Sequence, residues 1–278
     1  FALFVVVSSR GLLMPRIALG VQYDGTAFQG WQSQPNGLTV QDVLEKALSQ
    51  FATVPLKVQC AGRTDAGVHA LEQIVHVDAP MTRALESWVR GANTFLPNSV
   101  AVRWAREVGE EFHARFDAFK RTYHYLIYNH PVRSPLWDNR AGWYHKPLDA
   151  DKMHAAAQSL VGTHDFSAFR AAQCQAKSPT KTMHNVQVQR HGDLIVVSLS
   201  ANAFLHHMVR NIVGSLVYIG AGKQPVAWMA DLLTQTNRTL AAPTFGAAGL
   251  YLAAIHYDET YGLPVPNDSV SALLGVEQ

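Results

Sequence analysis

Residues 56–78, LKVQCAGRTDAGVHALEQIVHVD, are the stretch that does most to decide the fold. Apolar and polar side chains alternate over residues 56–60, and residues 73–78 form a second run typical of a β-strand. A hairpin needs a connection of only about two to five residues. The connection here is far longer, and we therefore predict two strands joined by an elaborate polar loop.

The loop carries a cation, a hydroxyl group and a carboxylate in three consecutive positions, Arg63, Thr64 and Asp65. Gly62 and Gly67 flank them, and glycine lets a backbone bend sharply and approach a ligand closely. An aspartate that is ionised at neutral pH can act as a covalent nucleophile. The alternative is a surface ion pair between Arg63 and Asp65, which the length and pattern of the loop make less favourable.

Strands and helices alternate on both sides of this loop. Before and after it we predict strands at 16–23 and 100–108 and helices at 39–51 and 85–92. A similar order returns later, with strands at 122–128, 186–190, 194–200 and 250–257 and helices at 149–161, at 204–219 and from Pro225 onward. The pattern predicts an α+β fold of two pseudo-duplicated split βαβ halves, like ferredoxin or RRM domains.

The two predicted halves share one mixed, mainly antiparallel sheet, with helices on one face and a cleft on the other. We place an extension at residues 1–13, an N-terminal half with the polar loop at 14–110, a C-terminal half at 111–260 and a tail at 261–278. The apolar run at residues 1–7 is too short to span a bilayer, which takes about 20 residues.

Composition narrows the class of protein without naming a partner. Hydrophobic residues make up 48% of the chain, charged residues 16%, and the net charge is +2. A site for a polyanion must therefore come from a local cluster of Arg and Lys. Two distant cysteines, Cys60 and Cys174, form no disulfide framework. We expect a cytoplasmic protein with no membrane association.

The loop sequence GRTDAGVH at 62–69 resembles the signature of the tRNA pseudouridine synthase A family. Other stretches resemble further motifs of that family in the same order along the chain. They are YDG at 23–25 with GWQ at 30–32, FHARF at 112–116, YHY at 123–125, FLHHMVRN at 204–211 and GLYL at 249–252. The resemblance covers about residues 14–260.

The resemblance implies an enzyme without a cofactor that breaks the N-glycosidic bond of uridine, turns the base and joins C5 to C1′. It makes Asp65 the catalytic carboxylate and Arg210 its charged partner. A carboxylate in a closed site needs such a partner, because burial would otherwise neutralise it. Three routes stay open for Asp65: attack at C1′, attack at C6, or removal of the C2′ proton.

The resemblance also implies the groups that hold the target base. Tyr123 would stack on the base, and Leu250 would form an apolar wall opposite the ring. Stacking of a base on an aromatic ring is worth about 1–3 kcal/mol. Arg63 would enter the RNA helix as the base leaves it, which helps because base flipping costs a few kcal/mol. A phosphate contact is the other interpretation of Arg63.

The expected partner is tRNA, contacted at its anticodon stem-loop and its elbow, with positions 38, 39 and 40 as targets. Recognition of an A-form stem favours contacts to shape and backbone. Beyond Arg63, the candidate RNA-contacting residues are Arg83, Phe112, His113, Ala114, Arg115, Phe116, Gln173, Cys174, Gln175, Ala176 and Lys177. A homodimer is implied by the resemblance alone.

Other classes of function fit less well. If His206 and His207 lie on a helix, their side chains point about 100° apart and chelate one ion poorly. We therefore expect no metal and give both a structural or RNA-facing role. An RNA-binding protein with duplicated RRM-like halves is the alternative, but it would not need Asp65, and the aromatic RNP1 pattern is missing. A serine hydrolase would need a Gly-x-Ser-x-Gly elbow, which is also missing.

Overall fold

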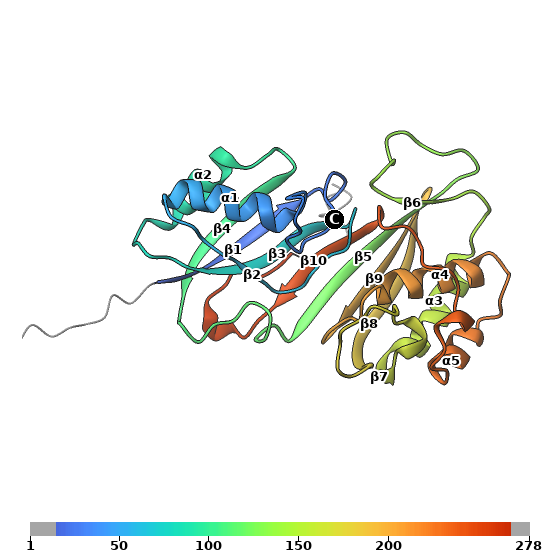
Figure 1. Cartoon of the computed structure of the whole chain (residues 1–278). Helices are drawn as coiled ribbons and strands as arrows, with labels where there is room; N and C mark the ends of the chain where they lie inside the picture. Colours follow the sequence, from blue (N-terminus) through green and yellow to red (C-terminus); the bar gives the residue numbers. More distant parts are fainter. Residues whose placement is uncertain (1–14, 268–278) are drawn as a thin grey trace, which may run out of the picture.

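The computed structural model describes residues 15–267, which form an α+β fold around one large mixed sheet (Figure 1). The main strand order is β4-β1-β3-β10-β5-β9-β8-β7, while β2 pairs with β3 and β6 with β5. The predicted extension at residues 1–13 and the end of the predicted tail, residues 268–278, lie outside the described residues.

The N-terminal half places β1 between β4 and β3, antiparallel to both. Its elements are β1 (Arg16–Tyr23), α1 (Val40–Ala52), β2 (Gln59–Cys60), β3 (His69–Asp78), α2 (Leu85–Phe95) and β4 (Val100–Val108). Helix α1 begins where predicted, because the Thr39 side chain accepts a hydrogen bond from the Asp42 backbone N–H. Leu44 and Leu48 of α1 are fully buried and pack with Trp88 of α2 in the core of this half.

The C-terminal half places β5 between β10 and β9, again antiparallel to both. Its strands are β5 (Lys120–Asn129), β6 (Gly142–Tyr144), β7 (Gly162–Asp165), β8 (Thr180–His191), β9 (Leu194–Ala201) and β10 (Leu250–His256). Its helices are α3 (Ala150–Ala157), α4 (Met208–Gly220) and α5 (Trp228–Leu233), with short 3₁₀ turns at Gln158–Leu160, Ser167–Phe169, Arg238–Leu240 and Glu259–Tyr261. Figure 1 shows α1 and α2 over one end of the sheet and α3, α4 and α5 over the other.

The two halves join where β10 runs parallel to the start of β3, with Tyr251 opposite His69. His69 fastens this junction. Its Nδ1 accepts a hydrogen bond from the Gly25 N–H, and its Nε2 lies 2.8 Å from the Asn139 carbonyl and 3.0 Å from that of Ala248. The polar loop that precedes His69 is therefore held at the seam between the halves.

Several predicted boundaries are wrong. Strand β3 begins at His69 and not at residue 73, and β6 and β7 were not predicted. Helix α4 begins at Met208 and not at residue 204, because Leu205 and Met208 close a turn and His207 has a φ of 61°. A non-glycine residue with this left-handed backbone does not continue a right-handed helix. The two histidines thus precede the helix.

Candidate active site

A pocket of about 860 Å³ lies between the two halves. The N-terminal half contributes residues 58–65, the β5 region contributes Arg115, Arg121 and Tyr123, and the C-terminal half contributes residues 203–210 and Leu250. The seam of the sheet brings these distant segments together. A volume of this size is in the range of small-molecule and cofactor sites.

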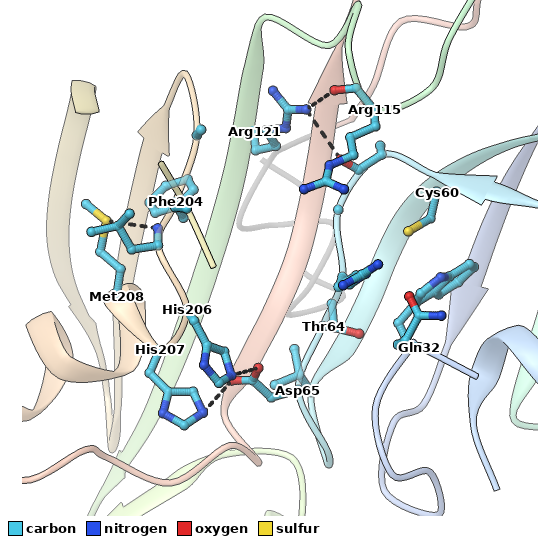
Figure 2. A pocket seen from close by; sticks show the side chains of 18 of the residues that line it. Gln32, Cys60, Thr64, Asp65, Arg115, Arg121, Phe204, His206, His207 and Met208 are labelled. Atoms are coloured by element: carbon cyan, nitrogen blue, oxygen red, sulfur yellow. Dashed lines mark hydrogen bonds and ion pairs between the residues drawn. The ribbon is translucent and has the colours of Figure 1, made fainter. Parts of the chain in front are cut away.

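Asp65 is the centre of a cluster of charged and polar groups in this pocket (Figure 2). Arg210 Nη1 lies 3.1 Å from Asp65 Oδ2, His206 Nε2 lies 3.1 Å from Oδ1, and His207 Nε2 lies 3.3 Å from Oδ2. The Asp65 side chain is 23% exposed. Its carboxylate is therefore turned into the pocket, next to the Arg210 guanidinium and the two imidazole rings.

Arg210 is fixed in place at the start of α4. Its Nε donates to the Phe245 carbonyl at 2.9 Å, and the Phe245 N–H donates back to the Arg210 carbonyl. Its side chain is 16% exposed. The structure thus pairs Asp65 with Arg210 and not with Arg63, which is exposed at the pocket wall.

Buried polar contacts set the shape of the loop. The Tyr23 hydroxyl and Thr64 Oγ1 are 2.8 Å apart, and the Gln73 amide donates to the Gly62 carbonyl and accepts from the Gly62 N–H. Gly67 has a φ of +77°, as expected of a sharp bend, whereas Gly62 has no positive φ. The chain nevertheless bends at Gly62, as predicted, and the Gln73 side chain holds this glycine through both hydrogen bonds.

Gly30 brings a second segment against the loop. The Trp31 N–H donates to the Thr64 carbonyl at 3.0 Å. A Cβ on Gly30, whose φ is +88°, would lie 2.8 Å from that same carbonyl oxygen. The GWQ motif therefore supports the backbone on which Asp65 is mounted.

Tyr123 and Leu250 line the pocket near Asp65. The Tyr123 ring meets the Phe204 ring edge to face, with centroids 5.0 Å apart. Burial, assisted by the charge of Asp65, raises the pKa of the Tyr123 hydroxyl, so the ring is a neutral phenol near pH 7. Leu250 opens β10 and is 95% buried. An aromatic face and an apolar wall are thus present in the pocket.

The other candidate RNA-contacting residues divide into two groups. Arg115, Phe116 and residues 173–176 line the pocket. The side chains of Phe112 and Ala114 lie in the core, half-buried His113 packs on Phe116, and exposed Arg83 and Lys177 lie outside the pocket lining. Side-chain contact with RNA at Phe112 and Ala114 is therefore wrong, because both are completely buried.

Arg121 was not predicted as a site residue, yet it organises the pocket wall. Its guanidinium donates to the carbonyls of Ala118, Asn202, Ala61 and Arg115. Figure 2 shows it reaching the Arg115 backbone. Burial lowers the pKa of Arg121. The sequence signal for Arg121 is weak: in the segment 115–121, basic residues outnumber acidic ones.

The two histidines were also missed. The argument that their side chains diverge by 100° is wrong, because His206 and His207 lie in the turn before α4 and their ring centroids are 4.0 Å apart. With Asp65 they offer ligand atoms within 4.8 Å of one another, so this set could hold a metal ion. The Arg210 guanidinium on the same carboxylate opposes a second cation there.

Comparison with known proteins identifies a family whose match includes the residues of this pocket. A model of the tRNA pseudouridine synthase family matches residues 20–117 and 156–258. The chain belongs to this family. The two matched stretches carry Asp65 and Arg210, so the family match includes both sides of the pocket.

Close relatives extend the match over nearly the whole chain. A tRNA pseudouridine synthase A of Herminiimonas arsenicoxydans is 61% identical over 261 residues, covering 92% of this chain and 95% of the relative. Proteins of the same name from Janthinobacterium sp. (strain Marseille) and Paraburkholderia xenovorans are 59% and 58% identical, covering 90% and 91% of this chain and 94% of each relative.

The chain is thus a tRNA pseudouridine synthase, an isomerase, as the sequence motifs predicted. Its substrate is tRNA. Within residues 15–267, no helix combines the length and the hydropathy needed to cross a membrane.

Proposed function

We propose that the enzyme isomerises uridines at positions 38, 39 and 40 of the tRNA anticodon stem-loop, with Asp65 as the nucleophile on a flipped-out base. The observation that carries this proposal is the Asp65 carboxylate, turned into the pocket and paired with Arg210 at 3.1 Å. An ionised carboxylate fixed by an arginine is a group from which covalent or proton-transfer chemistry can start.

The reaction needs few groups, because atoms are conserved between substrate and product. The N1–C1′ bond breaks, the base turns, C5 bonds to C1′, C5 loses a proton and N1 gains one. Asp65 serves in any of three ways: by attack at C1′, by attack at C6, or by removal of the C2′ proton. No cofactor enters this scheme, and a metal is not required.

The pocket supports the binding of a base outside its helix. Tyr123 offers a neutral aromatic face for stacking, and Leu250 offers an apolar wall. Arg63 is exposed at the pocket wall, two residues from Asp65, where it fills the space that the base vacates. Inserting a side chain offsets part of the cost of base flipping, which is a few kcal/mol.

The rest of the tRNA is held by groups around the pocket. Arg115 and Phe116, which is 74% exposed, present a cation and an aromatic ring beside it. Residues 173–176 line the pocket as well, and exposed Arg83 and Lys177 lie outside its lining, where they meet the backbone of the stem and the elbow. We also propose that the enzyme is a cytoplasmic homodimer, so that one tRNA can touch both subunits.

The strand orders support a further element of the proposal. In each half the first strand lies between the last and the next-to-last of that half, as β4-β1-β3 and as β10-β5-β9. We infer that these are two pseudo-duplicated split βαβ units whose cleft receives the RNA.

Incubation of the enzyme with unmodified tRNA tests the proposal. Carbodiimide labelling and mass spectrometry of the isolated anticodon arm should detect pseudouridine at positions 38, 39 and 40. A tRNA in which those three uridines are cytidines is the matched control and should gain none. Pseudouridine found only in another arm would refute the proposed target, and binding without any product would favour the RNA-binding alternative.

A further inference from the structure

Two histidines with no role in the proposed reaction contact the Asp65 carboxylate directly. His206 Nε2 lies 3.1 Å from Oδ1, and His207 Nε2 lies 3.3 Å from Oδ2. Their rings are tilted by 38° to each other, with centroids 4.0 Å apart, and come from the turn that precedes α4 (Figure 2). A substrate that reacts with Asp65 must therefore approach a carboxylate that both rings already contact.

The two oxygens of Asp65 are not equivalent. Oδ2 accepts a hydrogen bond from Arg210 and lies within ion-pair distance of His207, whereas the contact found at Oδ1 within the described residues is that with His206. A donor or a cation close to a carboxylate oxygen stabilises its negative charge, which weakens that oxygen as a nucleophile or base. Oδ1 is therefore the more reactive atom once His206 moves aside.

The three donors also differ in how firmly they are held. Arg210 is anchored to the Phe245 carbonyl, and its side chain is 16% exposed. The His207 side chain is 27% exposed, and burial lowers its pKa. The His206 side chain is 38% exposed, the most of the three. This ring is thus the least enclosed of the three groups around Asp65.

The backbone of His206 is held by two hydrogen bonds. Its N–H donates to Cys174 Sγ at 3.4 Å, and its carbonyl accepts from the Ala171 N–H at 3.0 Å. Rotation about the side-chain bonds alone can therefore free Oδ1. The turn that carries His207 and Arg210 does not have to rearrange.

We propose that Oδ1 is the oxygen of Asp65 that acts on uridine, and that His206 is a positioning residue that holds Oδ1 until the nucleotide displaces it. His207 and Arg210 remain on Oδ2 and fix the plane of the carboxylate. This inference rests on the proposed function of Asp65. It does not depend on the route, because attack at C1′, attack at C6 and removal of the C2′ proton all need one free oxygen.

Kinetics of paired variants separate the two histidines. With tRNA carrying tritium at C5 of uridine, release of tritium follows loss of the C5 proton. His207→Ala should lower kcat about tenfold with KM nearly unchanged, and His207→Gln, which keeps a donor at the Nε2 position, should restore most of it. His206→Ala should lower KM about three- to tenfold, because the nucleotide no longer displaces a ring from Oδ1 to enter, and His206→Gln should return KM toward the wild-type value.

Exposed His191, at the end of β8, is the matched control, and His191→Ala should change neither constant. The inference is overturned if His206→Ala raises KM, or if it lowers kcat as much as His207→Ala does. Thermal melting of each variant shows whether it is folded before its kinetics are compared.

A second measurement needs binding but no turnover. In ¹⁵N-histidine-labelled enzyme, addition of an anticodon stem-loop RNA should shift the His206 Nε2 signal and leave that of His207 in place. The Gln variants assign the two signals. Movement of His207 with His206 unchanged contradicts the inference. If the wild-type enzyme binds RNA without forming pseudouridine, the proposed function fails, while the spectra still decide which histidine is displaced.

Discussion

Replacing Gly30 by alanine tests how Asp65 is supported. The new Cβ would lie 2.8 Å from the Thr64 carbonyl oxygen, and ordinary contact begins at 3.4 Å, so the loop must move by about half an ångström. A misplacement of 1 Å costs up to about 100-fold in rate. We therefore expect kcat to fall about tenfold, with KM for tRNA nearly unchanged.

Gly37→Ala is the matched control for this change. Gly37 also has a positive φ, +67°, but a Cβ there meets no atom within 4 Å. Both variants carry the cost of a left-handed backbone, about 1–2 kcal/mol, which lowers Tm by roughly 2–8 °C. Only Gly30→Ala should lose turnover in the tritium-release assay. Equal kcat values for the two variants would refute the supporting role of Gly30.

Two further predictions concern buried polar groups. Gln73→Leu should destabilise the protein by about 2 kcal/mol and lower kcat, because both backbone groups of Gly62 lose their partner in a buried site; a denaturant titration beside the kinetics checks this. His76 accepts a hydrogen bond from the Ala114 N–H, and burial lowers its pKa from the usual 6.5 to about 4. As pH falls, the unfolded chain protonates this histidine before the folded protein does, so the free energy of unfolding should fall by about 3 kcal/mol between about pH 6.5 and about pH 4. His76→Gln should reduce this loss of stability at acidic pH. An unchanged pH dependence in the variant would contradict the role of His76.

Local patterns predicted much of the fold. The strands at 16–23 and 100–108 have the predicted bounds, because their alternation is regular and their ends carry turn residues. Helices α1 and α3 begin next to the predicted residues 39 and 149, because Thr39 and Asp149 cap them and a cap depends on residues only three positions away. The short strands β6 and β7 have too few residues to show a period, and they form only because longer strands pair with them.

The candidate site was less predictable from the residues alone. Asp65 and Arg210 are 145 positions apart, and only the family resemblance linked them. The role of the histidines was missed because Phe204 and Leu205 continue the apolar pattern of α4, although the chain turns at His207 before the helix begins. Contacts such as that of Gln73 with Gly62 depend on which strands pair and leave little trace in the local sequence.

The central claim is that the Asp65 carboxylate performs the chemistry, and Asp65→Asn tests it most directly. Asparagine keeps the shape of the side chain but can neither attack carbon nor accept the C2′ proton. With enzyme in excess over unmodified tRNA, we expect wild-type affinity for tRNA, an unchanged fold and no pseudouridine by mass spectrometry. Pseudouridine formation by this variant at a rate near that of the wild type would contradict the account.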